Sequence, residues 1–285
     1  MTLSQLKYEY SNITRLIKSL NIINENYTIK KIIKTSNKKG SYVVSNNTGK
    51  KFFLKAKLKD FVTENELNIY KKIKKYPHKN INKINAIYET SRFVLIISDF
   101  IEGFEMGDSK YWKIYEDDLN NIFMQLLNAI LHLNSLEISH CDINPTNIMI
   151  NIVNSRECVP VLIDFDFARF FTDLKVNKSY GSLGFIPPEI HEGYISSKTD
   201  EWALAMSFYF RIFKNILSQN DIKEIETESY YDLSFLNLDF LNKYDGKYKQ
   251  LVLELKKMLN VKCEERPDIQ VIINKIRTIT KIDKQ

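Results

Sequence analysis

The sequence lacks any long run of apolar residues. Its longest apolar run spans residues 93–97, far short of the roughly 18 residues that a membrane-spanning helix needs. The opening stretch, MTLSQLKYEYSN, contains no apolar core of the length that secretory signals have. We therefore expect a chain without a membrane span.

Cysteine is also scarce. The chain has three cysteines, Cys141, Cys158 and Cys263, and none of them stands in a CxxC spacing. An odd number without such spacing argues against a disulfide framework and against a zinc site. We therefore expect a reducing compartment and a cytoplasmic location, in the cytoplasm of a host cell if the chain comes from a pathogen.

No block of one charge dominates the sequence. Lysine and arginine number 41 and aspartate and glutamate 35, which gives a net charge of +6 spread over 285 residues. Such an even distribution is typical of a solvated surface, so we expect no specific nucleic-acid partner. The length fits one large domain or two lobes.

The first hundred residues combine a helical pattern with short β-prone segments. Apolar residues recur at helical spacing near the N-terminus, which predicts a helical extension over residues 1–26 that packs on the domain behind it. The members of this apolar stripe are Leu3, Leu6, Tyr10, Ile13, Ile17 and Leu20. Short β-prone segments bounded by turn residues then predict strands at 27–33, 40–44, 50–56, 84–90 and 92–100. Between the third and fourth of these, apolar residues at helical spacing predict a short helix at 64–73.

The rest of the chain is dominated by helical periodicity. The pattern predicts a long helix over 115–136 and a further helix, buried nearly all round, over 200–213. Residues 147–152 and 159–165 are typical of a small β-hairpin. The aromatic and polar segment 228–248 has no clear period, and we find no internal repeat. We divide the chain into an extension (1–26), a sheet-rich part (27–100) and a helical part (101–285).

A polar loop, HCDINPTN, occupies residues 140–147 just before an apolar run. It resembles the catalytic loop HRDLKPxN of the protein kinase superfamily, and the chain is similar to that superfamily over roughly residues 28–280. The resemblance implies an α+β, bilobal fold with a small β-rich N-lobe containing one main helix and a larger helical C-lobe. It also implies that Asp142 orients or accepts the proton of the attacking hydroxyl and that Asn147 holds magnesium. Phosphoryl transfer depends mainly on such positioning and charge neutralisation.

The segment VLIDFDFAR resembles the family's DFG segment. The resemblance implies that Asp164 chelates magnesium bound to the nucleotide phosphates. On its own, Asp164 would be read as a carboxylate in a turn at a strand end. The upstream loop is what favours the metal-binding role.

Three further motifs resemble the structural signature of the family. GSLGFIPPEI is similar to GTPGYMAPE and includes Ser182 and Glu189, so residues 164–189 would form a short activation segment. KTDEWALAMS is similar to the DxWxxG helix, and ERP supplies Arg266. In the family this arginine pairs with the glutamate found here at 189, because a buried carboxylate needs a partner. Glu189, Arg266 and Asp200 of the KTDEWALAMS segment are expected to serve architecture and not chemistry.

The phosphate-binding lysine of the family falls in the segment KKFFLKA. We expect it to be Lys55, with Lys57 as the competitor, since Phe52 and Leu54 then share the core-facing side of the strand. Its partner carboxylate should be Glu66, because apolar residues follow it at +3, +4 and +7. A solvated lysine and glutamate on a basic surface is the alternative.

The segment RFVLIISDFIEGFEM resembles the strand that leads into the hinge of the family. Adenine would bind backbone groups near Asp99 and Ile101, and Ser98 would take the gatekeeper position. Glu105 is a candidate for the ribose, although an exposed carboxylate at a helix start fits almost as well.

Several positions depart from the family pattern. Of the three glycines of the phosphate-covering loop only Gly40 is kept, which predicts weaker cradling of phosphate. Cys141 replaces the arginine that receives an activation-loop phosphate, so activity should not need that phosphorylation. Asn144 replaces the lysine of serine/threonine kinases. Asp166 replaces the glycine of DFG and should restrict the backbone there.

The resemblance thus implies a divergent, eukaryotic-like protein kinase that uses ATP and Mg²⁺. We expect its partners to be protein substrates of unknown identity, phosphorylated on serine or threonine. Two alternatives stay open: a pseudokinase that acts as a binding scaffold, and a small-molecule kinase of the aminoglycoside or choline type. Retention of Lys55, Glu66, Asp142, Asn147 and Asp164 argues against the first, and the GSLGFIPPE segment argues against the second.

Overall fold

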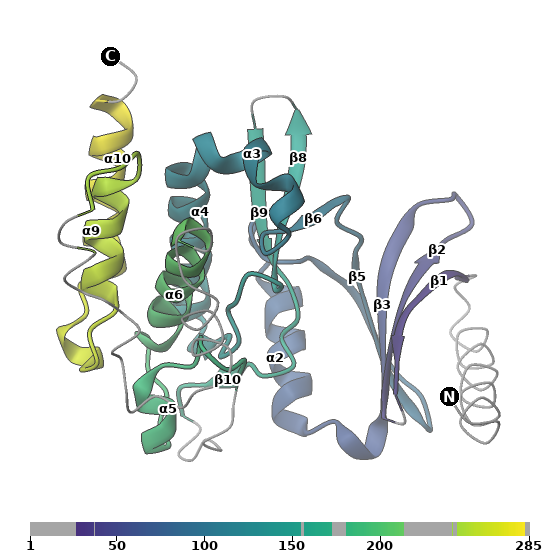
Figure 1. Cartoon of the computed structure of the whole chain (residues 1–285). Helices are drawn as coiled ribbons and strands as arrows, with labels where there is room; N and C mark the ends of the chain where they lie inside the picture. The colour runs from purple at the N-terminus through teal and green to yellow at the C-terminus, as the bar shows by residue number, and fades with distance from the viewer. Residues whose placement is uncertain are drawn as a thin grey trace, which may run out of the picture. The chain divides into compact units, whose positions relative to one another are not determined.

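The computed structural model describes residues 27–36, 38–154, 157–172, 181–213, 241 and 244–282. The chain divides into two compact units, residues 1–78 with 82–101 and residues 79–81 with 102–285. Figure 1 labels their helices and strands. The extension expected over 1–26 and most of the segment 228–248 lie outside the described residues.

The first unit is built on a five-stranded antiparallel sheet. Its strand order is β1-β2-β3-β5-β4. The strands are β1 (Thr28–Thr35), β2 (Lys39–Ser45), β3 (Lys51–Leu58), β4 (Ile84–Glu89) and β5 (Phe93–Asp99). All five agree with the strands predicted from the sequence, with ends that differ by at most two residues.

The turn between β2 and β3 follows from its sequence. The Asn46 side-chain oxygen accepts hydrogen bonds from the backbone N–H groups of Thr48 and Lys50, at 3.1 and 2.9 Å. Gly49 has a φ of 81°, which a residue without a Cβ adopts at little cost. These residues fix the turn that pairs β2 with β3.

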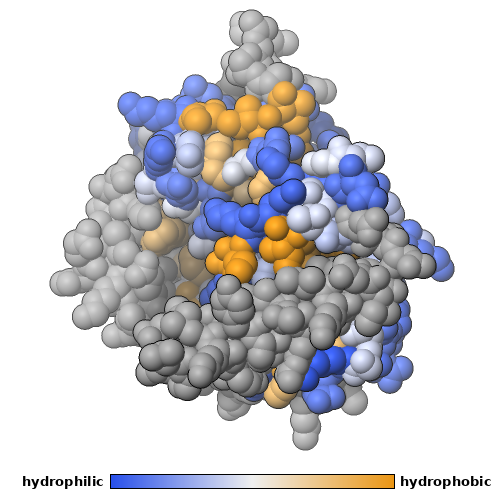
Figure 2. All heavy atoms as spheres, turned by 90° about the vertical axis from the view of Figure 1, so that its right-hand side faces the viewer, coloured by the Kyte–Doolittle hydropathy of each residue, from blue (hydrophilic) through white to orange (hydrophobic). Residues whose placement is uncertain are grey.

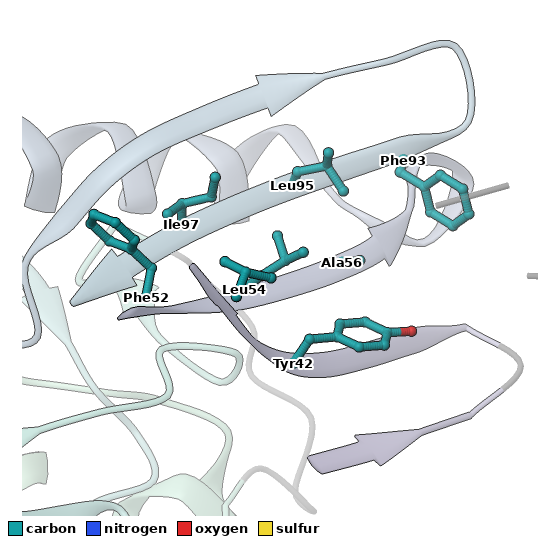
Figure 3. Packing of buried hydrophobic residues seen from close by; sticks show 8 residues of the cluster. Tyr42, Phe52, Leu54, Ala56, Phe93, Leu95 and Ile97 are labelled. Carbon is teal, nitrogen blue, oxygen red and sulfur yellow. The ribbon is translucent and has the colours of Figure 1, made fainter. Parts of the chain in front are cut away.

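Side chains alternate between the two faces of this sheet, because a strand has a period of two. In β3, Phe52, Leu54 and Ala56 face a buried apolar layer that also includes residues of β2 and β5 (Figure 3). On the other face lies α2 (Glu64–Lys75), which packs against β4 and pairs with Lys57. The Thr63 hydroxyl accepts a hydrogen bond from Glu66 N–H and caps the start of this helix. A 3₁₀ turn, η1 (Lys59–Phe61), connects β3 to α2.

The second unit is mainly helical. Its helices are α3 (Trp112–Tyr115), α4 (Leu119–Ser135), α5 (Pro188–Glu192), α6 (Thr199–Phe213), α9 (Lys249–Met258) and α10 (Ile269–Ile282). In the described part of this unit, three 3₁₀ turns accompany them: η2 (Ser109–Tyr111), η3 (Glu116–Asp118) and η5 (Cys263–Glu265). The helix predicted over 115–136 starts only at Leu119, because residues 116–118 form η3. In α6, 14 of 15 residues are buried, which confirms the prediction of a helix covered nearly all round.

Two small sheets complete this unit. One has the order β6-β8-β9, with β6 (Gly103–Glu105), β8 (Ile148–Asn154) and β9 (Glu157–Leu162), so the predicted hairpin is confirmed. The other pairs β7 (Ile138–Ser139) with β10 (Arg169–Phe170). Strand β9 ends at Leu162, earlier than predicted, since Asp164 has a φ of 63° that does not fit a strand. In the described part of the chain no helix is long and apolar enough to cross a membrane.

Candidate active site

The loop that follows β7 is held in place by Asp200, at the start of α6. The carboxylate of Asp200 accepts hydrogen bonds from the Ser139 hydroxyl at 2.9 Å, from His140 N–H at 2.7 Å and from Cys141 N–H at 3.0 Å. Burial raises the pKa of the Asp200 carboxyl, while the neighbouring His140 and the hydrogen bonds from these donors act in the opposite direction. Asp200 therefore fixes the start of the loop, in the architectural role that the sequence predicts.

Asp142 is almost buried, at 9% exposure, and both of its carboxylate oxygens are held. Oδ1 accepts from Ser182 N–H at 2.8 Å and from the Asn144 amide at 3.2 Å. Oδ2 accepts from the Asn147 amide at 2.8 Å. The carboxylate thus has a fixed orientation set by its own loop and by the segment around Ser182, which is what a base or an orienting group needs.

Asn144 connects the loop that carries Asp142 to the segment around Ser182. Its amide nitrogen donates to the Asp142 backbone and carboxylate and to the Ser182 hydroxyl, at 3.1 to 3.2 Å. Its oxygen accepts from the Thr146 N–H and hydroxyl at 2.9 and 2.6 Å. The sequence reasoning treated Asn144 only as a lost lysine and missed this role. The N-x-T spacing was the available signal, because an Asn side chain readily bonds the backbone two residues on.

Asn147 and Asp164 lie on segments that are directly hydrogen-bonded to each other. The N–H of Ile163 donates to the carbonyl oxygen of Asn147 at 3.0 Å, and Asp164 is the next residue. Asp164 and Cys141 both have left-handed backbones, with φ of 63° and 60°. This conformation is strained by about 1 to 2 kcal/mol per residue other than glycine, and such strain concentrates at functional sites.

The donor atoms here fit a magnesium ion. The Asn147 amide nitrogen donates to Asp142, so its oxygen is the atom that can face a cation, and Asp164 adds a carboxylate. Magnesium prefers such hard oxygen ligands and completes its shell with waters and phosphate oxygens. Among the described residues no group of three or more His, Cys, Asp or Glu side chains forms a metal cage. The two protein ligands are consistent with an ion that phosphates also hold.

The buried His140 side chain connects the backbone at Asp142 to the segment that carries Ile163 and Phe165. Its Nε2 lies 3.0 Å from the carbonyl oxygen of Ile163, and its Nδ1 accepts from Asp142 N–H at 3.3 Å. The ring also packs on Phe165, with centroids 4.6 Å apart. Because a carbonyl can only accept, Nε2 carries the proton in this arrangement. Burial raises the pKa of the neighbouring Cys141 thiol, which keeps it neutral.

The lysine that pairs with Glu66 is Lys57. Its Nζ lies 2.5 Å from a Glu66 carboxylate oxygen, and the two side chains are only 10% and 8% exposed. We had expected Lys55 in this pair, so this pairing corrects the prediction. The strand argument could not separate the two lysines, because residues two apart lie on the same face. Lys55 is buried as well, at 6% exposure.

Three further nucleotide-site candidates lie at the end of β5 and just after it: Ser98, Asp99 and Ile101. Ser98 is buried and its hydroxyl accepts from the Asn82 amide at 3.1 Å. The N–H of Asp99 donates to the Lys83 carbonyl oxygen at 3.0 Å. Ile101 ends the first unit. Their contacts with a nucleotide stay predictions.

Two candidates have surroundings that the sequence did not indicate. Gly40 lies at the start of β2, where a Cβ would collide with the outer end of the Tyr42 ring, so a larger residue would have to displace that side chain. Glu105 is exposed at the end of β6 and is not at a helix start. Any contact of either residue with a nucleotide stays a prediction.

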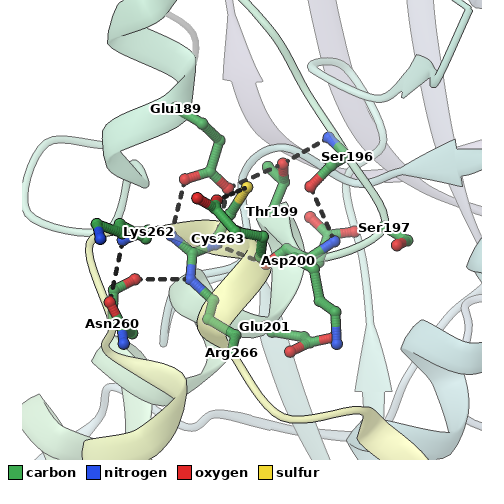
Figure 4. A network of polar contacts seen from close by, with 12 residues as sticks. Glu189, Ser196, Ser197, Thr199, Asp200, Glu201, Asn260, Lys262, Cys263 and Arg266 are labelled. Carbon is green, nitrogen blue, oxygen red and sulfur yellow. Dashed lines mark hydrogen bonds and ion pairs between the residues drawn. The ribbon is translucent and has the colours of Figure 1, made fainter.

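The predicted pair of Glu189 and Arg266 is present (Figure 4). The guanidinium donates to both carboxylate oxygens at 2.7 and 2.8 Å, and both side chains are buried. Nearby, burial raises the pKa of Glu201 from 4.5 to about 8, although Lys198 lies 3.5 Å away and opposes the shift. The sequence reasoning did not single out Glu201.

Known protein kinases are similar to this chain over part or most of its length. The model of the protein kinase domain matches residues 23–276. Calcium-dependent protein kinase 4 of Plasmodium berghei is 26% identical over 195 residues, which cover 66% of this chain and 36% of that protein. The same kinase of Plasmodium falciparum gives the same identity and coverage.

Sperm motility kinase Z of Mus musculus is 31% identical over 145 residues, which cover 49% of this chain and 28% of that protein. The chain therefore matches about a third of the length of these curated relatives. The domain model, by contrast, spans both units and nearly every described element. The chain belongs to the protein kinase family.

Proposed function

We propose that this protein kinase is catalytically active and transfers the γ-phosphate of ATP to a hydroxyl of a protein substrate. The observation that carries the proposal is the Asp142 carboxylate, which three N–H donors hold in one orientation. A fixed carboxylate can accept or direct the proton of an attacking hydroxyl, and correct positioning supplies most of the acceleration in phosphoryl transfer.

Asn147 and Asp164 are the residues that would hold magnesium. Bound there, the ion would neutralise charge on the phosphate oxygens. The Asn147 amide donates to Asp142 and so links the metal ligand to the base. A change at either ligand should therefore affect both magnesium dependence and the position of the base.

The ion pair with Glu66 distinguishes the two lysines of β3. The resemblance implies that one lysine both pairs with this glutamate and contacts the α- and β-phosphates, so the close pair supports Lys57 for both roles. Lys55, buried on the same face of the strand, becomes the competitor. Removal of Lys57 should weaken nucleotide binding and loosen α2, and a larger loss of nucleotide binding on removal of Lys55 would return the phosphate role to Lys55.

The remaining nucleotide contacts are proposed from the resemblance. The Asp99 carbonyl oxygen and the Ile101 N–H would bind adenine, Gly40 would lie near the phosphates, and Glu105 would bind the ribose. Ser98 is small and buried, which supports its assignment as the gatekeeper. Inhibitors with bulky groups behind adenine should then bind well, and equal potency of bulky and unsubstituted analogues would count against this alignment.

Serine and threonine are the proposed acceptors. The support is Ser182, whose backbone N–H donates to Asp142 and whose hydroxyl accepts from the Asn144 amide, since the resemblance associates a hydroxyl residue at this position with serine/threonine kinases. Asn144 lacks the positive charge of the usual lysine, so charge on the transferred phosphate must be balanced by magnesium and by the lysine of β3. Phosphoamino-acid analysis of the labelled substrate tests the acceptor.

The experiment is transfer of radiolabel from [γ-³²P]ATP with magnesium, preceded by a thermal-shift measurement of nucleotide binding. Labelled protein, with loss of label when magnesium is chelated, is the expected result. A stabilising shift without any transfer would favour a scaffold. Label that appears only in an added aminoglycoside or choline would favour a small-molecule kinase, and either result overturns the proposal.

A further inference from the structure

One buried charge of the second unit has no part in the chemistry described above. Apolar patches among polar residues, such as those on the face that Figure 2 shows, are ordinary on a protein surface. A buried guanidinium is not ordinary, and Arg211, in the last turn of α6, is only 3% exposed. No carboxylate in the described part of the chain forms an ion pair with it, and its Nη2 has no hydrogen-bond partner there. Such a charge is costly unless other groups stabilise it.

Aromatic side chains stabilise this charge in place of a carboxylate. The guanidinium carbon of Arg211 lies 4.3 Å from the centre of the Trp112 ring and 5.8 Å from that of the Tyr115 ring. Cation–π contacts of this kind are strongest where water is excluded. The Arg211 Nε also donates a hydrogen bond to the Tyr115 hydroxyl at 2.7 Å. Arg211 is therefore bonded to one neighbour in particular, Tyr115.

Tyr115 connects Arg211 to the backbone at Met106. The Tyr115 side chain is completely buried, and its hydroxyl donates to the Met106 carbonyl oxygen at 2.6 Å. Burial raises the pKa of Tyr115, so the hydroxyl keeps the proton that it donates. With Arg211 as its donor and Met106 as its acceptor, the hydroxyl links two hydrogen bonds in series.

Met106 lies in a segment that is bonded to the strand and the loop of the candidate active site. Its N–H donates to the Ile148 carbonyl oxygen at 2.8 Å, and the N–H of Gly107 donates to the Pro145 carbonyl oxygen at 2.9 Å. The residue just before Met106 is Glu105, the candidate for the ribose. The bond from Tyr115 thus holds the backbone between Glu105 and the catalytic loop.

We propose that Arg211 is a positioning residue for nucleotide binding, and that it acts through Tyr115 on the backbone that carries Glu105. This role rests on the proposed function, since it takes Glu105 to lie at the nucleotide. Asp142 is held by three donors of its own. Loss of Arg211 should therefore weaken nucleotide binding more than it slows phosphoryl transfer.

Hydrogen exchange, followed by NMR in the full chain, tests the positioning without any need for activity. Arg211→Met removes the charge and the donor, and Tyr115→Phe removes the hydroxyl with little change of shape. Exchange of the Met106 and Gly107 N–H groups should become several-fold faster in both variants. Exchange that stays unchanged in Arg211→Met would overturn the proposal.

Tyr248→Phe is the matched control. The Tyr248 hydroxyl also donates to a backbone carbonyl, that of Glu116 at 3.3 Å, and its ring also packs edge-on against Trp112. This variant removes the same group from the same aromatic cluster but leaves the bond to Met106 intact. It should not change exchange at Met106, and an effect equal to that of Tyr115→Phe would overturn the proposal.

Steady-state kinetics tests the link to the nucleotide. In Arg211→Met and Tyr115→Phe, KM for ATP should rise about fivefold, which corresponds to about 1 kcal/mol, while kcat changes less. The double variant should be no worse than Tyr115→Phe, because Arg211 acts through that hydroxyl. Arg211→Lys keeps a charged donor and should restore most of the affinity. An unchanged KM, a fall in kcat alone, or additive effects would overturn the proposal.

Two further outcomes are kept apart. If the unchanged chain transfers no phosphate, the proposed function fails, and the role of Arg211 is then judged by exchange and by Kd for ATP in the same variants. If Tyr115→Phe does not fold, Arg211→Met and Arg211→Lys decide, since both keep Tyr115 and its bond to Met106.

Discussion

Breaking the pair of Glu189 and Arg266 should unfold the second unit more easily than almost any other single change. Arg266→Met keeps the volume of the side chain but leaves the Glu189 carboxylate buried without its partner. Removal of one partner from a buried ion pair costs about 3 to 5 kcal/mol. Arg266 also donates to the carbonyl oxygens of Asn260 and Lys198, both at 2.9 Å, which favours the upper part of this range.

The assay is thermal and urea unfolding of the full chain. For a unit of this size, each kcal/mol shifts Tm by about 2 to 4 °C, so Arg266→Met should lower Tm by about 6 to 20 °C. Lys262→Met is the matched control, because its ion pair with Glu265 has a similar length, 3.0 Å, but is exposed. That variant should leave Tm nearly unchanged.

A second substitution separates the charge effect from lost packing. Glu189→Gln in the Arg266→Met background removes the buried charge and should recover a large part of the lost stability. The reasoning is refuted if Arg266→Met and Lys262→Met have equal effects. It is also refuted if Glu189→Gln gives no recovery.

Three other predictions address pH, the β3 lysine and the catalytic loop. Because burial raises the pKa of Glu201 to about 8, the folded state keeps a proton that the unfolded state has lost above about 4.5. Unfolding free energy should therefore fall as pH rises through this window, and Glu201→Gln should remove that fall in urea titrations between pH 4.5 and 8; an unchanged pH slope would contradict it. Lys57→Met should destabilise the first unit, and Glu66→Gln in the same chain should recover part of the loss; additive effects in this double-mutant cycle would sink the pairing. Asn144→Ala removes one of the three N–H donors that hold the Asp142 carboxylate. A loss of about 1.4 kcal/mol in transition-state stabilisation would lower kcat about tenfold. Steady-state kinetics with unchanged kcat would exclude this role for Asn144.

Periodicity and turn chemistry were sufficient for most of the fold. The strands of the first unit, α2, the hairpin of β8 and β9, and α6 all follow from local patterns. The start predicted for α4 was wrong because residues 116–118 have helical composition but form a tighter, 3₁₀ turn. Local pattern does not distinguish these two kinds of turn well.

The candidate site was predictable where a residue's role depends on its own motif. Arg266 pairs with Glu189 as the motifs implied, and Ser182 contacts Asp142. The partner of Glu66 was not predictable, because two lysines on one face of β3 differ only in how far along the strand they lie. Which of them meets the helix depends on the position of α2, which is a tertiary property.

The role of Asn144 was missed for a related reason. As a substitution for lysine it looked like a loss, yet its amide nitrogen donates to Asp142 and Ser182. Its oxygen also accepts from Thr146, a contact that no lysine could make, since lysine has no acceptor. A comparison with a family pattern reveals what a residue no longer does. The contacts reveal what it does instead.

The most direct test of the proposed chemistry is phosphoryl transfer by Asp142→Ala next to the unchanged chain, with ATP, magnesium and a labelled protein acceptor. Nucleotide binding, followed by the shift in Tm, serves as the control for folding. The account predicts that Asp142→Ala binds ATP and magnesium and transfers no phosphate above background. Transfer at the rate of the unchanged chain would contradict it.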